Sequence, residues 1–353
     1  LVVKLNFSYS DFYTSFKTMN KSTIQILCLL LFWSVLTLIN IDKAFHIDDT
    51  FHLEAARCIG ENLLKPMSGL VNWGNSPSPI YNHNQPPLFF YLIYFVQFLF
   101  GKSEIAMHLF MSIFTLGALI FFYKLTQLLA VKSPLIIITL FAFCPAFIIN
   151  QNLMTDVPIM TLSLILMYYL LKGHQSNDIK FYLLSSLIIS IGLLIKYSLL
   201  PTCIVVLAST ISNKRYKKSI VIIIPLATLF LWSIWNYMEF GSIHIVSRPK
   251  SNFQLDHVFA FFGTLGAMSP FTAAFLYKII PKKIIRGLMV FGFTVFLISA
   301  LLVYFNFIDE KKFNVLLNFV FIINGGLIIF IISCKNVYSF FKEKNNYFKS
   351  SSF

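Results

Sequence analysis

Acidic and histidine side chains in the region 42–104 are the first candidates for chemistry. The stretch reads His46-Ile-Asp48-Asp49-Thr-Phe-His52. If it forms a helix, Asp48 and His52 lie on one face, because residues four apart are neighbours on a helix. A carboxylate beside an imidazole could act as a general base or bind a divalent metal ion. The alternative is a solvated loop in which the two aspartates only cap a helix.

A further acidic residue, Asp156, stands in the motif Thr155-Asp156-Val-Pro158. It could simply cap a helix, with the proline at the second helical position. It could also be a second acidic group facing the same site, because ionisable residues at the edge of an apolar span are often functional. We therefore predict Asp48, Asp49 and Asp156 as catalytic residues. Asp48 and Asp156 are also the candidate ligands for a metal ion.

Basic residues elsewhere in the chain are candidates for binding a phosphate group. They are His83, Lys196, Arg248 and Lys250. An arginine can hold a phosphate through two parallel hydrogen bonds, whereas a lysine acts as a point charge. The alternative is that these long side chains only reach towards the interface between lipid and water.

The composition indicates which elements must position these residues. The chain has 353 residues, of which 57% are hydrophobic and 12% charged, and its mean hydropathy is +0.75. A soluble domain is about 25% charged, so the composition excludes an ordinary soluble enzyme, a disordered chain and a fibrous protein. The net charge of +14 does not indicate a nucleic-acid partner, because the basic residues lie in short runs between apolar spans.

The fold class predicted is an all-α polytopic membrane protein with ten transmembrane helices. A further apolar stretch, 87–100, is short for a span and is expected to lie on the membrane surface as an external helix. The predicted spans are 24–41, 105–123, 134–150, 157–171, 181–195, 198–212, 219–238, 255–280, 287–307 and 314–333.

The distribution of Lys and Arg predicts the topology. If 87–100 does not cross, most basic residues lie on the cytoplasmic side and most acidic residues outside, as the positive-inside rule requires. Both termini are then cytoplasmic, and Asp48 and Asp156 share the external side. Met19 is a candidate start of translation. The expected segments are a cytoplasmic N-terminal segment 1–23 (with 1–18 untranslated if Met19 is the start), a membrane domain 24–333 with external loop 42–104, and a basic cytoplasmic tail 334–353.

Several common motifs are absent from the sequence. It contains no Walker loop, GxGxxG, HExxH or GxSxG motif, which argues against an ATP-driven pump, a Rossmann domain, a zinc protease and a serine hydrolase. The five cysteines have no CxxC spacing, so neither a disulfide framework nor a zinc site is predicted.

Taken in order, the motifs resemble the GT-C superfamily of integral-membrane glycosyltransferases. The branch they resemble contains protein O-mannosyltransferases, aminoarabinose (lipid A) transferases and bacterial RgtA/B/C/D-like enzymes. The family's acidic pair is matched by Asp48-Asp49, with His52 following, and Asp49 replaces the usual Glu. The other matching stretches are Pro86-Pro87-Leu88 through Phe100-Gly101-Lys102-Ser103-Glu104, Thr155-Asp156-Val157-Pro158, and Gly192 to Lys196-Tyr197.

The sequence departs from the family pattern at two further positions. Gln85 stands where many members carry Lys or His, a position associated with the donor phosphate, and His108 stands where Arg is common. The large external C-terminal domain of longer relatives is not in this sequence.

The resemblance implies sugar transfer from a polyprenyl-phosphate donor by an inverting displacement. The acceptor is an unidentified lipid, glycan or protein on the external face of the cell (inner or plasma) membrane. Asp48 would be the base, Asp156 and His52 would orient the acceptor or a metal ion, and Lys196 and Arg248 would stabilise the leaving phosphate.

The expected partners are the donor and membrane lipids, without nucleic acid. No cofactor is predicted with certainty, and a divalent metal ion is the one left open. Two alternatives also stay open. The first is a transporter or flippase of a lipid-linked glycan, and the second is a catalytically inactive relative, which the residues Gln85 and His108 would favour.

Overall fold

The computed structural model describes most of the chain in two compact units, residues 1–250 and 251–353. The predicted site residue Lys250 lies outside the described residues, as do 1–19, 336–353 and parts of the predicted spans 255–280 and 314–333. The described residues are 20–74, 76–83, 85–212, 214–248, 254–267, 282–307, 309 and 322–335.

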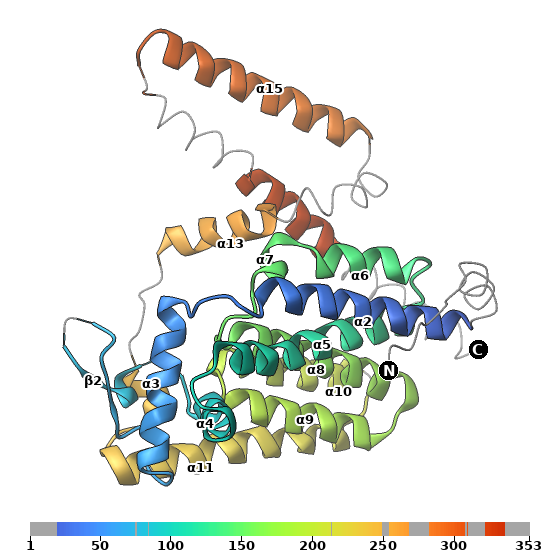
Figure 1. The fold of residues 1–353 in the computed structure, drawn as a ribbon. Helices are drawn as coiled ribbons and strands as arrows, with labels where there is room; N and C mark the ends of the chain where they lie inside the picture. Colours follow the sequence, from blue (N-terminus) through green and yellow to red (C-terminus); the bar gives the residue numbers. More distant parts are fainter. Residues whose placement is uncertain are drawn as a thin grey trace, which may run out of the picture. The chain divides into compact units, whose positions relative to one another are not determined.

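Long apolar helices build the first unit (Figure 1). Among the described residues, four helical stretches are long and apolar enough to cross a membrane. The 25 residues of the longest single helix reach beyond about 30 Å of hydrocarbon at about 1.5 Å per residue. The prediction of an all-α polytopic membrane protein is confirmed. The helices are α2 (Lys21–Asn40), α5 (Glu104–Leu128), α8 (Asp156–Ser176), and η3 (Tyr216–Ile222) continuing into α11 (Ile223–Phe240).

Shorter helices complete this unit and depart from the predicted spans in two places. The stretch 134–150 is two helices, α6 (Pro134–Ala142) and α7 (Pro145–Ile148), because Pro145 cannot continue a helix from the preceding turn. The stretch 198–212 starts as a 3-10 turn before becoming a helix. The short elements are η2 (Tyr197–Leu199), α9 (Ile179–Leu193), α10 (Thr202–Ser212) and α12 (His244–Ser247).

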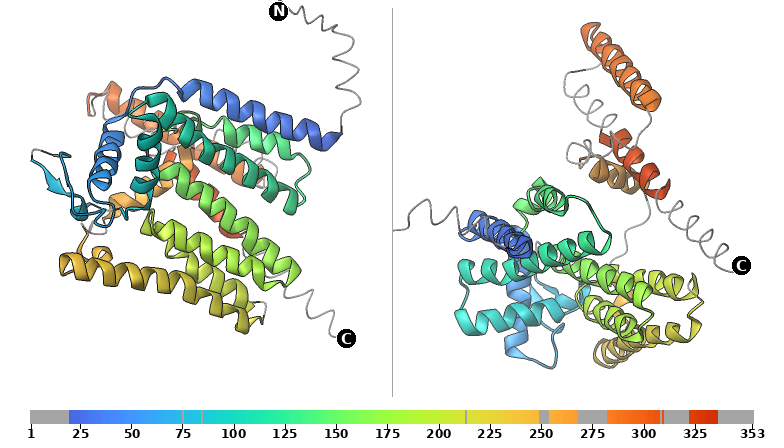
Figure 2. Two further views of the ribbon diagram at one scale, coloured as in Figure 1. Left: turned by 60° about the horizontal axis from the view of Figure 1, so that its bottom comes forward. Right: turned by 90° about the vertical axis from the view of Figure 1, so that its right-hand side faces the viewer.

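Two helices lie across the ends of the long ones, as both figures show (Figures 1 and 2). They are α3 (Ile47–Glu61) and α4 (Leu88–Phe100). Between them a small antiparallel hairpin of β1 (Leu70–Val71) and β2 (Ser78–Pro79) leads into η1 (Ile80–Asn82).

Both ends of α4 lie at one end of the long helices. At its start, the Leu88 backbone N–H donates to the Leu194 carbonyl, just beyond α9, at 3.0 Å. At its end, Gly101 turns the chain directly into α5, whose first residue, Glu104, accepts from the Phe45 backbone N–H at 3.4 Å. The 13 residues of α4 therefore begin and end on the same side of the long helices. On this side the start of α3, the start of α5, the start of α8 and the end of α9 lie near one another.

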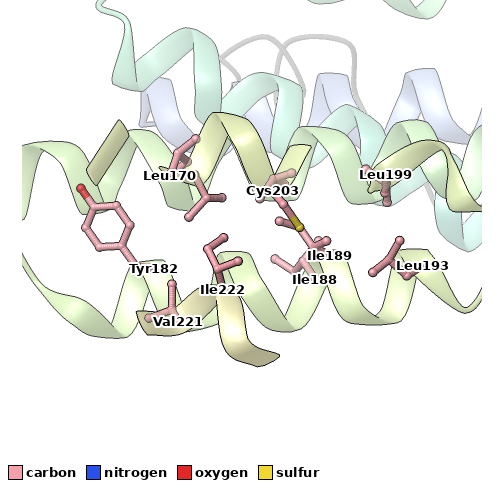
Figure 3. Packing of buried hydrophobic residues seen from close by; sticks show 11 residues of the cluster. Leu170, Tyr182, Ile188, Ile189, Leu193, Leu199, Cys203, Val221 and Ile222 are labelled. Carbon is pink, nitrogen blue, oxygen red and sulfur yellow. The ribbon is translucent and has the colours of Figure 1, made fainter. Parts of the chain in front are cut away.

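A buried hydrophobic cluster holds α8, α9, α10 and η3 together (Figure 3). Gly192 lets the chain after α9 fold back closely, because a Cβ there would lie 2.0 Å from a methyl carbon of Leu199. The packing fixes the ends of α8 and α9 relative to each other. The residues labelled in Figure 3 are Leu170, Tyr182, Ile188, Ile189, Leu193, Leu199, Cys203, Val221 and Ile222.

The second unit contains α13 (Leu255–Ala267), α15 (Lys282–Tyr304) and a helix at Ile322–Lys335. Glycines let α13 and the helix 322–335 approach backbone to backbone. A Cβ on Gly266 would lie 1.6 Å from the Ile322 carbonyl oxygen, and one on Gly326 would lie 1.8 Å from the Phe262 carbonyl oxygen. Any larger residue at either position would force the helices apart.

Candidate active site

The start of α3 is fixed by a reciprocal pair of caps. The His46 side chain accepts from the Asp48 backbone N–H at 3.3 Å, and the Asp49 carboxylate accepts from the His46 backbone N–H at 2.7 Å. Asp49 is fully buried, and this burial raises its pKa, although the bond from His46 opposes the rise. The sequence suggested an aspartate cap, but the cap residue is His46. Asp49 closes the capping box from inside the helix.

A cavity of about 240 Å³ opens beside this helix start. Asp48 and His52 both line it, as their spacing predicted, and the Asp48 side chain is 37% exposed. The His46 ring lies 3.7 Å from the Asp48 carboxylate. The lining comes from α3, the hairpin, the segment before α4 and the segment before α8: Asp48, Phe51, His52, Trp73, His83, Gln85 and Met154.

His52 is buried at the wall of this cavity without a hydrogen-bond partner for either ring nitrogen. Its surroundings are the rings of Phe51, Phe89 and Phe90. Burial lowers the pKa of His52 to about 4, so the ring is neutral at pH 7. The buried Gln85 side-chain oxygen also lacks a partner. Such groups are rare in folded proteins, and at the wall of a cavity they can take hydrogen bonds from a ligand or from water.

An ion pair between Asp156 and Lys196 lies close to His52. The Lys196 ammonium donates to the Asp156 carboxylate at 3.0 Å, and the side chains are 37% and 48% exposed. Both charges act on His52, where Asp156 raises the pKa and Lys196 lowers it. Asp156 is the first helical residue of α8 and Thr155 is the cap residue, so the predicted aspartate cap is displaced by one position. Asp156 is not among the cavity-lining residues.

His83 and Arg248 are joined to the site by a network. Trp232 Nε1–H donates to the Tyr197 hydroxyl at 2.8 Å, and this hydroxyl lies 2.8 Å from His244 Nδ1. His244 Nε2 lies 2.7 Å from the His83 carbonyl oxygen, which can only accept, so Nε2 carries the proton and Nδ1 accepts from Tyr197. The Arg248 guanidinium lies over the Tyr197 ring, 5.3 Å from its centroid.

Several residues of this site were not predicted from the sequence. Trp73 is 39% exposed at the cavity, with its ring 5.6 Å from that of Phe51. A single aromatic residue in the turn-rich stretch Asn72-Trp73-Gly74 is a signal that could have found it. His244 is fully buried, and nothing local in the sequence points to it, because its partners are distant in the chain.

A second hollow, an apolar groove of about 310 Å³, lies nearby. Two of its lining residues, Pro87 and Leu194, stand two positions from Gln85 and Lys196 in the chain. The two hollows are therefore lined by neighbouring stretches of the chain. Its lining is Leu63, Leu64, Pro66, Pro87, Leu88, Tyr91, Leu194, Trp232 and Trp235.

The candidate metal ligands do not form a metal-binding set. In the part of the chain that the structure describes, no three His, Cys, Asp or Glu side chains gather in a way that could hold an ion. Asp156 is paired with Lys196, so its carboxylate is already neutralised. The residues described do not fit a divalent metal ion between Asp48 and Asp156.

A match to a known family bears on the class of this site. Residues 84–237 match the model of the dolichyl-phosphate-mannose-protein mannosyltransferase family. This match supports a membrane glycosyltransferase of GT-C type. The matched segment is a little under half of the chain and includes Gln85, Asp156 and Lys196, whereas Asp48 and His52 precede it. The curated proteins include no match to this chain.

Proposed function

We propose that this protein is a GT-C glycosyltransferase that transfers a sugar from a polyprenyl-phosphate donor to a hydroxyl group of a lipid, glycan or protein acceptor, with inversion at the anomeric carbon. The main support is the cavity in which the Asp48 carboxylate faces the partnerless groups of His52 and Gln85, beside the Asp156–Lys196 ion pair. The family match supports the class of reaction.

The two hollows suggest how the donor lies. The polar cavity of about 240 Å³ is below the roughly 300–1,000 Å³ of drug-sized ligand pockets, which suits a single sugar ring. Trp73 offers an apolar ring face to the sugar, and His52 and Gln85 offer hydrogen bonds. The apolar groove suits the isoprenoid chain of the donor, because its lining is aliphatic and aromatic. The phosphate, which joins sugar to chain, then lies near Lys196.

In the proposed step the Asp48 carboxylate takes the proton of the acceptor hydroxyl. The hydroxyl oxygen forms a bond to the anomeric carbon, and the bond from this carbon to the phosphate oxygen breaks with both electrons leaving on the phosphate. Lys196 stabilises the charge that develops there, and Arg248 contributes a second positive charge. His52 stays neutral and orients a sugar or acceptor hydroxyl.

We place this reaction on the external face of the cell membrane, with both termini cytoplasmic. The distribution of basic residues favours this orientation. The positions of the two ends of α4, beside Leu194 and Phe45, agree with a surface helix that leaves Asp48 and Asp156 on one side.

The substitution Asp48→Asn tests the proposal, with Asp42→Asn as the control. Asp42 is exposed in the segment before α3 and is absent from the cavity lining. The protein in liposomes is given a panel of polyprenyl-phosphate sugars, and release of polyprenyl phosphate is followed. We expect transfer by Asp48→Asn to fall by about 10²–10⁴, the usual contribution of a general base, with Asp42→Asn close to wild type.

Two outcomes would contradict the proposal. Unchanged transfer by Asp48→Asn would remove Asp48 as the base. Movement of intact lipid-linked sugar across the bilayer by wild type, without release of polyprenyl phosphate from any donor, would favour the transporter instead.

A further inference from the structure

His108, in α5, lies between two backbone carbonyl groups. Its Nδ1 is 2.8 Å from the Gln151 carbonyl oxygen and its Nε2 is 2.7 Å from the Lys43 carbonyl oxygen. The side chain is fully buried. A carbonyl oxygen can only accept, and a neutral imidazole has a single N–H. Both hydrogen bonds therefore form only when the ring carries two protons and a positive charge.

The two carbonyls belong to the segments that present the candidate acids. Lys43 stands between α2 and the cap residue of α3, so its segment leads to Asp48. Gln151 stands between α7 and α8, so its segment leads past Met154 of the cavity to Asp156.

Other bonds also join these segments, away from the His108 ring. The Lys43 ammonium donates to the Asn152 side-chain oxygen at 2.7 Å, and the Asn40 side chain donates to the Ile148 carbonyl at 2.7 Å. Among the hydrogen bonds described between α5 and these two segments, those of His108 are the ones in which a single side chain contacts both segments.

We propose that doubly protonated His108 is a positioning residue that holds the segments bearing Asp48 and Asp156 in register, so that transfer depends on its proton. The catalytic part of this inference rests on the proposed function, whereas the charge state of the ring does not. When the ring loses one proton, one of the two carbonyls loses its donor. A buried carbonyl without a donor is unfavourable, so the segment carrying it shifts.

Ionisable groups face His108 from three parts of the chain. From α3, the fully buried Asp49 carboxylate interacts electrostatically with His108. From α5 itself, Glu104 lies one turn before His108 and accepts from the Phe45 backbone. From the segment after α2, the Lys43 ammonium is occupied by Ile149 and Asn152.

The charge state is tested directly, without an activity assay. The full chain is labelled with ¹⁵N-histidine, placed in lipid bilayers and examined by solid-state NMR at pH 6 and pH 8. His108→Gln identifies the signals of His108 by their loss. We expect both ring nitrogens to be protonated at pH 6. A neutral ring at both pH values would overturn the proposal.

The positioning role is tested by the pH profile of sugar transfer. Arginine has two outward N–H groups and stays charged, so His108→Arg should keep the transfer rate and lose the fall that wild type shows as the ring deprotonates at higher pH. His108→Gln should lower kcat about tenfold at pH 6 with a smaller change in KM, and its difference from wild type should shrink at pH 8. The exposed residue His257 provides the control His257→Gln, which should keep the wild-type profile.

These outcomes separate the inference from the proposed function. If His108→Arg folds and keeps the wild-type pH dependence, the positioning role is wrong. If His108→Arg does not fold, the NMR signals and the kcat of His108→Gln decide. If Asp48→Asn transfers normally while His108 is doubly protonated, Asp48 is not the base. The inference that His108 holds the two segments together is then unaffected.

Discussion

The two ends of the α8–α9 helix pair both carry polar groups, but they differ in how these groups are paired. At the end that holds the cavity, His52 and Gln85 have buried atoms without partners. At the other end, the Arg215 guanidinium donates to the Gly173 carbonyl at 2.7 Å, the His174 carbonyl at 3.0 Å and the Tyr182 hydroxyl at 3.1 Å.

The groups at the Arg215 end have a structural explanation. Gly173 and His174 are in the last turn of α8, where carbonyls lack partners within the helix. A positive charge is also favourable at a helix C-terminus. Lys218 is a second cation at this helix end, and its ammonium donates to the side-chain oxygen of Asn177, the C-cap residue of α8, at 2.6 Å. These cations complete the helix and leave no demand for a ligand.

The difference shows which polar groups to regard as functional. A buried group without a partner lowers stability, so its presence needs a reason outside the fold. The ligand proposed for the cavity end supplies this reason, and substitutions at the two ends should therefore have opposite effects on activity and stability.

The largest effect is expected from Lys196→Gln at the cavity end. This change removes the charge that we place beside the leaving phosphate, and transfer should fall by about 10²–10³, as when one stabilising donor is lost from an active site. Lys196→Arg, which keeps the charge, should retain more activity. Release of polyprenyl phosphate measures both variants.

The matched control is Lys180→Gln. Lys180 also pairs with an aspartate, Asp178 at 2.8 Å, but at the other end of the helix pair. The Lys180→Gln variant should transfer sugar at the wild-type rate. An equal loss of transfer in both variants would show that ion pairs of α8 and α9 affect activity through the fold alone.

Arg215→Ala should have the reverse profile. Loss of the bonds to Gly173, His174 and Tyr182 should lower the free energy of unfolding by about 2 kcal/mol, with transfer per folded molecule unchanged. Thermal unfolding in detergent and the transfer assay together measure this. A loss of transfer without a loss of stability would mean that the two ends are functionally coupled.

The sequence predicted those parts of the site that depend on local spacing. The i, i+4 relation of Asp48 and His52 placed both at one cavity, because a helix repeats every 3.6 residues. The short length of 87–100 predicted a helix separate from the long ones, and α4 is one. Asp156 and Lys196 were each recognised, but their pairing was not, since 40 positions separate them.

The remainder depends on contacts between distant segments. The chain from Trp232 through Tyr197 and His244 to His83 joins three regions that no local pattern connects. The two carbonyl partners of His108 are backbone groups, so their identity could not be read from residue types. The predicted catalytic roles and the cytoplasmic termini stay predictions.

The pH dependence of stability tests whether His52 is held neutral by burial. Its pKa is about 4 in the folded chain against an ordinary 6.5. Below pH 6.5 the unfolded chain binds a proton that the folded chain does not, so stability should fall as pH falls from 6.5 towards 4. The loss from this residue at pH 5 is about 2 kcal/mol by linkage.

His52→Phe should remove that part of the loss, since a phenyl ring fits among Phe51, Phe89 and Phe90 and has no proton to bind. Some pH dependence will remain, because burial also lowers the pKa of His83 and His244. Thermal unfolding of both proteins at pH 5 and pH 7 measures the difference. An identical loss in the variant and wild type would show that His52 is hydrated or protonated in the folded protein.

The smallest effect is expected at the apolar groove. Leu64 is 82% exposed there, so Leu64→Gln should fold normally. If the groove holds the isoprenoid chain, the loss of about 1 kcal/mol of apolar contact should raise the KM for a long-chain donor about fivefold and leave a donor with one or two isoprene units unaffected. Leu38→Gln, on the 69% exposed Leu38 of α2, is the control and should change neither KM. Equal KM values for the long-chain donor in all three proteins would place the chain elsewhere on the molecule. The proposed position of the donor would then rest on the polar cavity alone, because only a dependence on donor length distinguishes a groove that binds the isoprenoid chain from one that merely faces lipid.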